Sequence, residues 1–215
     1  MRMEPIRIAE LLQPFCPKEN LTPDQLHNIS IYIDMLQHWN ARINLTSVRD
    51  PEQIVTRHFG ESLFAGWNLL PRSQQAFQRV VDVGSGAGFP GLPLKLWVPE
   101  IQLTLIESNQ KKATFLREVI RKLALTKADV FSGRAEAFPA ASADLVTMRA
   151  IERFEEAVPA AANLVRAGGR IALLIGQSQS SKALDLGPRF LWDHPILVPN
   201  SSARVLLTAH KPASI

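Results

Sequence analysis

The spacing of hydrophobic residues predicts helices along the first seventy positions. Thr22, Pro23 and Asp24 provide a capping hydroxyl, a proline at the first helical position and an early acid, which are typical of a helix start. Apolar side chains then recur at helical spacing on one face, at Leu26, Ile29, Ile33 and Leu36. Asp50 and Pro51 indicate a second helix start. We expect these helices to form an N-terminal helical cap, residues 1–75, that packs on the rest of the chain.

A different pattern begins near Arg79. Short β-rich runs alternate with helical stretches, which is typical of parallel strands joined by right-handed helical crossovers. The runs cover residues 79–83, 102–106, 128–131, 145–147, 170–175, 196–198 and 204–208. Helices are expected to begin near Gly91, Asn109, Arg153 and Ser178. We therefore predict a doubly wound, mostly parallel α/β sheet in a main domain of residues 76–215.

The last two runs are connected differently from the others. Residues 199–202, Pro-Asn-Ser-Ser, separate them and read as a turn with no helix. Such a turn favours an antiparallel C-terminal hairpin at one edge of the sheet.

The composition is that of an ordinary globular protein and narrows the function only slightly. The chain has 215 residues, 46% of them hydrophobic, and its single cysteine, Cys16, excludes an intramolecular disulfide and a cysteine-based zinc cluster. We expect a soluble cytoplasmic protein, because the first residues lack an apolar signal core and no apolar run approaches the roughly 18 residues of a membrane-spanning helix. The net charge of +4 favours contact with a polyanion without requiring it.

A glycine-rich turn follows the first predicted strand. Residues 80–83 are apolar except for Asp82, and four glycines between positions 84 and 91 lead into the next predicted helix. In an open α/β sheet such a turn binds nucleotide-like ligands, because glycines let the backbone approach the ligand and the helix presents free N–H groups. Glu107 ends the next strand, 19 residues beyond Gly88, where a carboxylate can accept both ribose hydroxyls of adenosine.

Three kinds of ligand compete for this turn. A kinase-type phosphate loop is disfavoured, because Leu92 and Pro93 stand where it needs a lysine and a serine or threonine. A dinucleotide fits the glycine spacing of residues 86–91, but its first glycine should follow the strand directly. Asp82 would repel a pyrophosphate and attract the ammonium and sulfonium groups of S-adenosylmethionine. The turn therefore favours a methyl donor; alternatively, Asp82 holds the glycine amides in place.

Further motifs accompany the turn in a fixed order along the chain. They are Asn44-Leu45-Thr46-Ser47-Val48-Arg49-Asp50-Pro51, Arg57-His58, Glu61-Ser62, the turn from Asp82 to Gly91, Glu107-Ser108, Lys111-Lys112, Phe115-Leu116, Gly133-Arg134-Ala135-Glu136 and Met148-Arg149-Ala150. Over about residues 22–176 this series closely resembles the small-subunit ribosomal RNA guanine-N7 methyltransferase family, also called the glucose-inhibited division protein B family.

The resemblance implies a class I methyltransferase fold of the Rossmann-like type, S-adenosylmethionine as the cofactor, and methylation of N7 of one guanine in 16S ribosomal RNA. It implies cofactor contacts at Gly84, Phe89, Ala135, Glu136 and Arg149, and Glu107 matches its acidic ribose position. Asp82 and Gly86 join them from the turn itself. No catalytic residue is assigned beyond Arg149, which we expect to position the reaction centre because it follows the fourth strand. The alternatives are helix packing for Ala135, a solvated charge for Glu136 and a surface position for Arg149.

The chain departs from the family pattern after the fifth predicted strand. Ile175-Gly176 stand where the family usually has Lys-Gly, and the remaining tail matches weakly. A cation for RNA or substrate is therefore missing at this position, which affects the expected target and leaves the cofactor unaffected.

The predicted chemistry needs alignment more than proton transfer. Guanine N7 offers a lone pair and has no proton to lose, so a general base is not required. Carbon methylation of a pyrimidine would need a cysteine nucleophile, but Cys16 lies far from the predicted strands in sequence. Methylation of an exocyclic amine is disfavoured as well, because Met148-Arg149-Ala150-Ile151 replaces the Asn/Asp-Pro-Pro-aromatic motif of such enzymes.

We expect the partner to be 16S ribosomal RNA or the assembling small ribosomal subunit, with no membrane and no metal. Candidates for RNA contact are Arg42, Arg49, Arg57 and His58, each with a solvated or internally paired position as its alternative. The basic run from Lys111 to Lys122 is interpreted as solvated surface. Two other functions stay open: a methyltransferase of the same fold acting on a small molecule or protein, and a nonenzymatic RNA-binding or assembly protein with a vestigial cofactor pocket.

Overall fold

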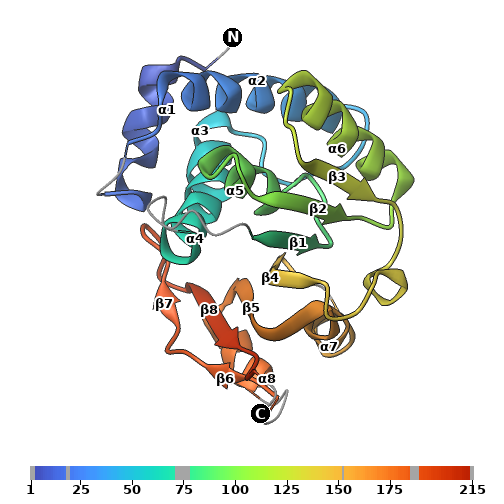
Figure 1. The fold of residues 1–215 in the computed structure, drawn as a ribbon. Coiled ribbons are helices and arrows are strands. Elements are labelled where there is room, and N and C mark those ends of the chain that lie inside the picture. The colour runs from blue at the N-terminus through green and yellow to red at the C-terminus, as the bar shows by residue number, and fades with distance from the viewer. Residues whose placement is uncertain (1–2, 18–19, 71–77, 152, 185–188, 214–215) are drawn as a thin grey trace.

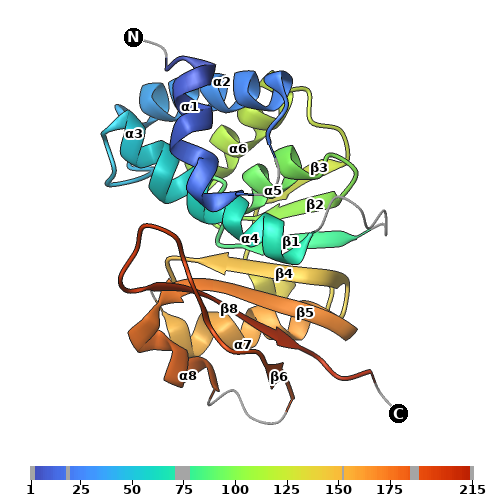
Figure 2. The same cartoon turned by 90° about the vertical axis from the view of Figure 1, so that its left-hand side faces the viewer.

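The computed structural model describes residues 3–17, 20–70, 78–151, 153–184 and 189–213. Within these ranges the chain forms an eight-stranded sheet with helices on both faces (Figures 1 and 2). The strands are β1 Arg79–Val83, β2 Gln102–Ile106, β3 Ala128–Phe131, β4 Ala143–Arg149, β5 Val165–Gly176, β6 Leu191–Trp192, β7 Ile196–Leu197 and β8 Arg204–His210. Their order is β3-β2-β1-β4-β5-β8-β6, with β7 paired to β8. The order reverses between β1 and β4, which is where doubly wound sheets bind ligands.

The predicted doubly wound, mostly parallel sheet is confirmed. Strands β1 to β5 pair in parallel, and β1, β2 and β3 have the predicted bounds. β5 begins at Val165 and not at Arg170, because Gly168 and Gly169 interrupt the apolar pattern on which the prediction depends. β4 likewise extends beyond the predicted residues 145–147 at both ends.

The predicted C-terminal hairpin is also present, but β8 does not lie at the sheet edge. Ile196 pairs with Leu206 and Leu197 with Val205, both antiparallel. On its other side β8 pairs with β5 from Arg204 to His210. The outer position belongs to β7, which the sequence predicts over residues 196–198, and to β6, which is not among the predicted strands.

Helices begin at or near the predicted starts, and the starts at Thr22, Asp50 and Asn109 have side-chain capping contacts. The helices are α1 Pro5–Leu12, α2 Pro23–Asn40, α3 Pro51–Gln53, α4 Glu61–Leu69, α5 Gly91–Trp97, α6 Gln110–Lys122, α7 Phe154–Leu164 and α8 Ser180–Leu184, with a π-helical segment Ile54–Gly60 joining α3 to α4. Thr22 Oγ1 accepts a hydrogen bond from Gln25 N at 3.2 Å, and Gln25 Oε1 accepts one from Thr22 N at 2.8 Å. Asp50 caps α3 with one bond: its Oδ1 accepts from Gln53 N at 2.8 Å. No helix in the described ranges has the length and hydropathy needed to cross a membrane.

Two hydrophobic clusters, one on each face of the sheet, form the core. Helices α1 to α6 gather on one face (Figure 1), where Tyr32 and Phe59 share a cluster with Leu103 of β2. Helices α7 and α8 cover the other face, where Val158 packs in a cluster with Val81 of β1. The N-terminal helices therefore share the core of the sheet.

The predicted boundary between residues 75 and 76 lies outside the described residues, so the division into cap and main domain stays a prediction.

A close contact between the N-terminal helices provides a test of this packing. A Cβ on Gly60 would stand 2.6 Å from Cε2 of Phe15, whose side chain is only 2% exposed. We expect Gly60→Ala to lower the free energy of unfolding by about 1–2 kcal/mol, because crowding of the ring outweighs the gain in helix propensity. Urea denaturation measures the change.

Gly66→Ala is the matched control. It lies in the same helical stretch, and its Cβ would stand 3.1 Å from Leu94 and 3.2 Å from Trp97, so we expect a smaller loss. Equal stabilities for the wild type and Gly60→Ala would show that Phe15 can move without cost.

Candidate functional site

The glycine-rich turn leaves β1 in a left-handed conformation. Gly84, Gly86 and Gly88 have φ angles of +68°, +56° and +92°, which glycine adopts without strain. A Cβ on Gly84 would meet no atom within 4 Å, whereas a Cβ on Gly88 would collide with Tyr32 Oη. The turn is therefore packed at Gly88 and open at Gly84.

Contacts from the sheet and from α2 hold this turn. The carbonyl of Ile106 accepts hydrogen bonds from Gly84 N at 2.9 Å and from Ser85 N at 3.1 Å. From the other side, the fully buried Tyr32 of α2 donates its hydroxyl to the carbonyl of Ala87. Its ring stacks on Phe89, with centroids 5.4 Å apart and planes within 2°.

Glu107 lies where the sequence predicts the ribose-binding acid. Its Oε2 accepts a hydrogen bond from Gly86 N at 2.8 Å, and its Oε1 accepts one from Asn109 N at 2.7 Å. The carboxylate thus connects the glycine turn to the N-terminus of α6, and Asn109 caps that helix as predicted. Each carboxylate oxygen has further lone pairs, so these bonds leave it able to accept ligand hydroxyls.

Asp82 lies beneath the turn and does not line its open side. The residue is fully buried, its Oδ1 accepts a hydrogen bond from Thr147 Oγ1 at 2.8 Å, and its Oδ2 has no partner among the described residues. Burial raises the pKa of Asp82 to about 6. A Cβ on Gly91 would come within 2.9 Å of the carboxylate. This position favours the structural alternative for Asp82, with Thr147 as the partner that the structure shows; a direct cofactor contact stays a prediction.

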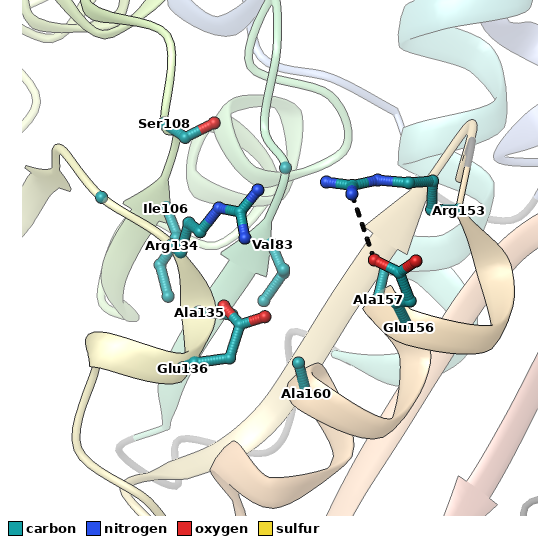
Figure 3. A pocket seen from close by; sticks show the side chains of 12 residues that line it. Val83, Ile106, Ser108, Arg134, Ala135, Glu136, Arg153, Glu156, Ala157 and Ala160 are labelled. Carbon is teal, nitrogen blue, oxygen red and sulfur yellow. Dashed lines mark ion pairs between the residues drawn. The ribbon is translucent and has the colours of Figure 1, made fainter.

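Two hollows meet at Gly84. The first hollow, of about 220 Å³, lies between β1, β2 and α7 (Figure 3), and its apolar floor includes Val83, Ile106, Ala157 and Ala160. Ala135 and Glu136, predicted from the resemblance, both line it. Arg134 and Arg153 extend toward each other from its two walls, and Arg153 pairs with Glu156 at 3.1 Å. An apolar floor with polar walls can hold a purine ring.

The second hollow, of about 390 Å³, is more polar. It lies between residues 44–48, the glycine turn and the end of β4. Phe89 and Arg149 line it, as does Gly84, which it shares with the first hollow. The two hollows thus share Gly84 of the turn, and a single extended ligand can occupy both.

A buried ion-pair cluster forms part of the second hollow. Glu61, 3% exposed, pairs with Arg149 Nη2 at 3.1 Å and with Arg204 Nε at 2.9 Å. Arg149 Nη2 also donates to the carbonyl of Arg57 at 2.7 Å. One carboxylate thus orients two guanidinium groups, and the wall keeps a net positive charge.

Arg204 is a site residue that the sequence reasoning missed. It begins a strand of aliphatic residues, and no local pattern distinguishes it from a surface arginine. It pairs across the sheet with Gly176, next to Ile175. Ile175 is buried in the core, and Arg204 supplies a cation near the position where the lysine was expected.

His58 lies in the second hollow as an uncharged group. Its Nε2 is 2.8 Å from Thr46 Oγ1, and its ring centroid is 5.0 Å from that of Phe89. Burial, followed by the positive charges of Arg149 and Arg57, lowers the pKa of His58 to about 3. The ring is therefore neutral near pH 7.

The other RNA-contact candidates divide into two groups. Arg57 lines the second hollow, whereas Arg42 and Arg49 are exposed outside it, and Arg49 Nη1 donates to Asn40 O at 2.9 Å. Lys112, interpreted from sequence as solvated surface, is half-buried and lines the hollow. That interpretation was wrong for Lys112, because the end of α6 that carries it abuts the glycine turn through Glu107. RNA contact at each of these residues stays a prediction.

Comparisons with known proteins agree with this geometry. A family model described as rRNA small subunit methyltransferase G matches residues 25–191. The ribosomal RNA small subunit methyltransferase G of Xanthomonas campestris pv. campestris (strain 8004) is 38% identical over 184 residues, covering 84% of each chain. That of Roseiflexus castenholzii is 36% identical over 203 residues, covering 88% of this chain and 84% of the relative.

Solved structures share the fold at low sequence identity. The magnesium protoporphyrin IX methyltransferase from Synechocystis PCC 6803, solved with bound S-adenosylmethionine, has a TM-score of 0.64 at 14% identity, covering 86% of this chain and 97% of that chain. A predicted O-methyltransferase from Agrobacterium tumefaciens has a TM-score of 0.55 at 22% identity, covering 65% and 76%. The predicted class I methyltransferase fold is confirmed.

The neutral state of His58 gives a pH dependence that can be measured. An unfolded histidine protonates near pH 6.5, whereas folded His58 does so only near 3, so acid favours the unfolded state between these values. We expect this group to remove on the order of 2 kcal/mol of stability between pH 6.5 and 5. His58→Gln lacks this contribution, so its free energy of unfolding falls less than that of the wild type in urea titrations at the two pH values.

His27→Gln, which changes an exposed histidine of α2, is the control and keeps the wild-type pH dependence. An unaltered dependence in His58→Gln would contradict the neutral assignment of His58.

Proposed function

Because the chain belongs to the rRNA small subunit methyltransferase G family, we propose that it transfers a methyl group from S-adenosylmethionine to N7 of one guanine in 16S ribosomal RNA. One observation carries the proposal: an apolar hollow and a polar, positively charged hollow meet at Gly84. The first suits an adenosine and the second suits part of an anionic RNA. A ligand bound over Gly84 would be accessible from the second hollow.

The residues present fit S-adenosylmethionine. The space over Gly84 is free where any other residue would place a Cβ, so a ligand can approach the backbone there. Adenosine would be held by Ala135 and Glu136 along the first hollow, with Glu107 at the ribose. Gly84, Gly86 and Phe89 would hold the methionine part, and Asp82 would act from beneath by fixing β1 to β4 through Thr147.

The chain's own residues bind and align the reactants. S-Adenosylmethionine, when bound, supplies an electrophilic methyl group on a sulfonium. Guanine N7 carries no proton, so no side chain has to accept one, and His58 with its lowered pKa is not needed as a base. Arg149, fixed by Glu61 and by the carbonyl of Arg57, acts as a positioning residue at the end of β4. Alignment of this kind accounts for a large part of the rate of a displacement reaction.

The positive wall of the second hollow supports an RNA target over a small neutral one. Arg149, Arg204 and Arg57 gather there with Lys112, against the single carboxylate of Glu61. Phosphate groups of RNA are attracted to such a wall. A specific base must be unstacked to enter the hollow, which favours folded 16S RNA or the assembling small subunit over a free nucleotide. A cytoplasmic location follows from this target and stays a prediction.

A methyl-transfer assay tests the proposal. The protein is incubated with S-adenosylmethionine labelled in its methyl group and with unmodified 16S RNA, free or assembled into small subunits. We expect label at one guanine, and chain cleavage specific for N7-methylguanine maps its position.

The alternatives predict other outcomes of the same assay. Binding of S-adenosylmethionine without transfer to either RNA form would favour a small-molecule or protein acceptor. RNA binding that S-adenosylmethionine leaves unchanged, again without transfer, would favour the nonenzymatic assembly protein.

A matched pair of glycine variants tests the cofactor site. Gly84→Ala places a Cβ in the space where the two hollows meet, and we expect it to weaken S-adenosylmethionine binding about tenfold or more in titration calorimetry. Gly168→Ala introduces the same left-handed strain at φ +71°, away from both hollows.

Both variants should lose about 1 kcal/mol of stability, and only Gly84→Ala should lose affinity. Wild-type affinity in folded Gly84→Ala would remove Gly84 from the site, and binding of NAD in place of S-adenosylmethionine would refute the cofactor assignment.

A further inference from the structure

A loop of five consecutive residues, 44–48, lines the second hollow between α2 and α3. Asn40, at the end of α2 and 6% exposed, fixes this loop through its side-chain amide. Its Nδ2 donates to Thr46 O at 2.9 Å, and its Oδ1 accepts from Leu45 N at 2.9 Å and from Thr46 N at 3.1 Å. Three hydrogen bonds from one buried side chain define the backbone path of the loop.

Thr46 ties the loop to the neighbouring wall. Its Oγ1 accepts a hydrogen bond from Val48 N at 3.1 Å and lies 2.8 Å from His58 Nε2. The contact between Thr46 Oγ1 and His58 Nε2 therefore links the loop to the neighbouring wall of the hollow. Other side chains of the loop have hydrogen-bonding groups that are still available to a ligand.

These groups are the side-chain amide of Asn44 and the hydroxyl of Ser47. Both are exposed and line the second hollow, and neither side chain makes a hydrogen bond to another residue in the described part of the chain. An amide and a hydroxyl, each able to donate and accept, thus stand on a preorganised backbone. Preorganisation of this kind lowers the entropic cost of binding a ligand.

We propose that Asn44 and Ser47 form the recognition site for the acceptor guanine and contact its Watson–Crick edge, including the 2-amino group. The inference rests on the proposed function, because it takes the methyl group to be presented at Gly84. A guanine that turns N7 toward Gly84 turns its Watson–Crick edge toward another wall of the hollow, and loop 44–48 supplies one. That edge offers two donors, N1–H and the 2-amino group, beside the acceptor O6, and an amide and a hydroxyl can pair with all three.

Recognition of the guanine through its Watson–Crick edge is compatible with methylation at N7. A side chain bonded to N7 would occupy the lone pair that accepts the methyl group, so recognition must use the other polar atoms of the ring. The cations that line the hollow, Arg57, Lys112, Arg149 and Arg204, can only donate hydrogen bonds. They cannot accept from N1–H or the 2-amino group, whereas the amide of Asn44 and the hydroxyl of Ser47 can.

The test combines two changes, one in the protein and one in the RNA. Asn44→Ala, Ser47→Ala and the double variant are assayed on 16S RNA carrying guanosine at the mapped target and on the same RNA carrying inosine, which lacks the 2-amino group. On guanosine RNA we expect kcat/KM to fall about tenfold for each hydrogen bond lost, while the Kd for S-adenosylmethionine stays unchanged.

On inosine RNA the single variant whose side chain contacts the 2-amino group, and the double variant, should lose clearly less, because that partner is already absent; N1–H and O6 are still present in inosine. Asn163→Ala, an exposed asparagine on α7 outside both hollows, is the control and should match the wild type on both RNAs.

Equal losses on guanosine and inosine RNA in both single variants and in the double variant would overturn the proposal, because they would indicate a general disturbance of the loop and no contact with the 2-amino group. Wild-type activity of the double variant on guanosine RNA would overturn it as well. A wild-type protein that methylates no RNA would instead contradict the proposed function, so the two failures are distinguishable.

Discussion

The turn between β1 and α5 keeps its shape because buried polar groups hold it from two directions. Glycine has more conformational freedom than any other residue, so left-handed glycines cannot fix a turn by themselves. On one side, Ile106 at the C-terminal end of β2 supplies its carbonyl and the following residue, Glu107, supplies its carboxylate. On the other side, α2 supplies the Tyr32 hydroxyl. Both hollows meet at Gly84, so their geometry depends on these contacts.

The features that were predictable from sequence are those set by neighbouring residues. The capping box at Thr22, the Asn109 cap and the glycine turn after β1 depend on residues within a few positions of one another, and all three were found. The roles of Arg204 and Lys112 depend on strands and helices that meet only in the folded chain. The lowered pKa of His58 could not be predicted for the same reason, because its surroundings come from other elements. The burial of Asp82 beneath the turn could not be read from the alternation of β1.

The second hollow combines fixed charge with neutral polar groups. Glu61 lets Arg149 and Arg204 remain in a largely buried position, where an unpaired guanidinium would be costly. In the proposed reaction, positive charge passes from the sulfonium to the guanine ring and no proton moves. A wall with excess positive charge is then better suited to the RNA phosphates than to the reacting base, which agrees with uncharged side chains in loop 44–48 contacting the base.

The Tyr32 contact has a consequence for the cooperativity of the molecule. It joins residues 55 positions apart, one in the N-terminal helical layer and one in the glycine turn. Any ligand that binds the ordered turn more tightly than the loose one must, by reciprocal linkage, also strengthen the docking of α2 on the sheet. Conversely, loosening the helical layer weakens ligand binding without altering a single contacting residue. Docking of the N-terminal helices and ligand binding at the turn are therefore thermodynamically coupled, and each strengthens the other.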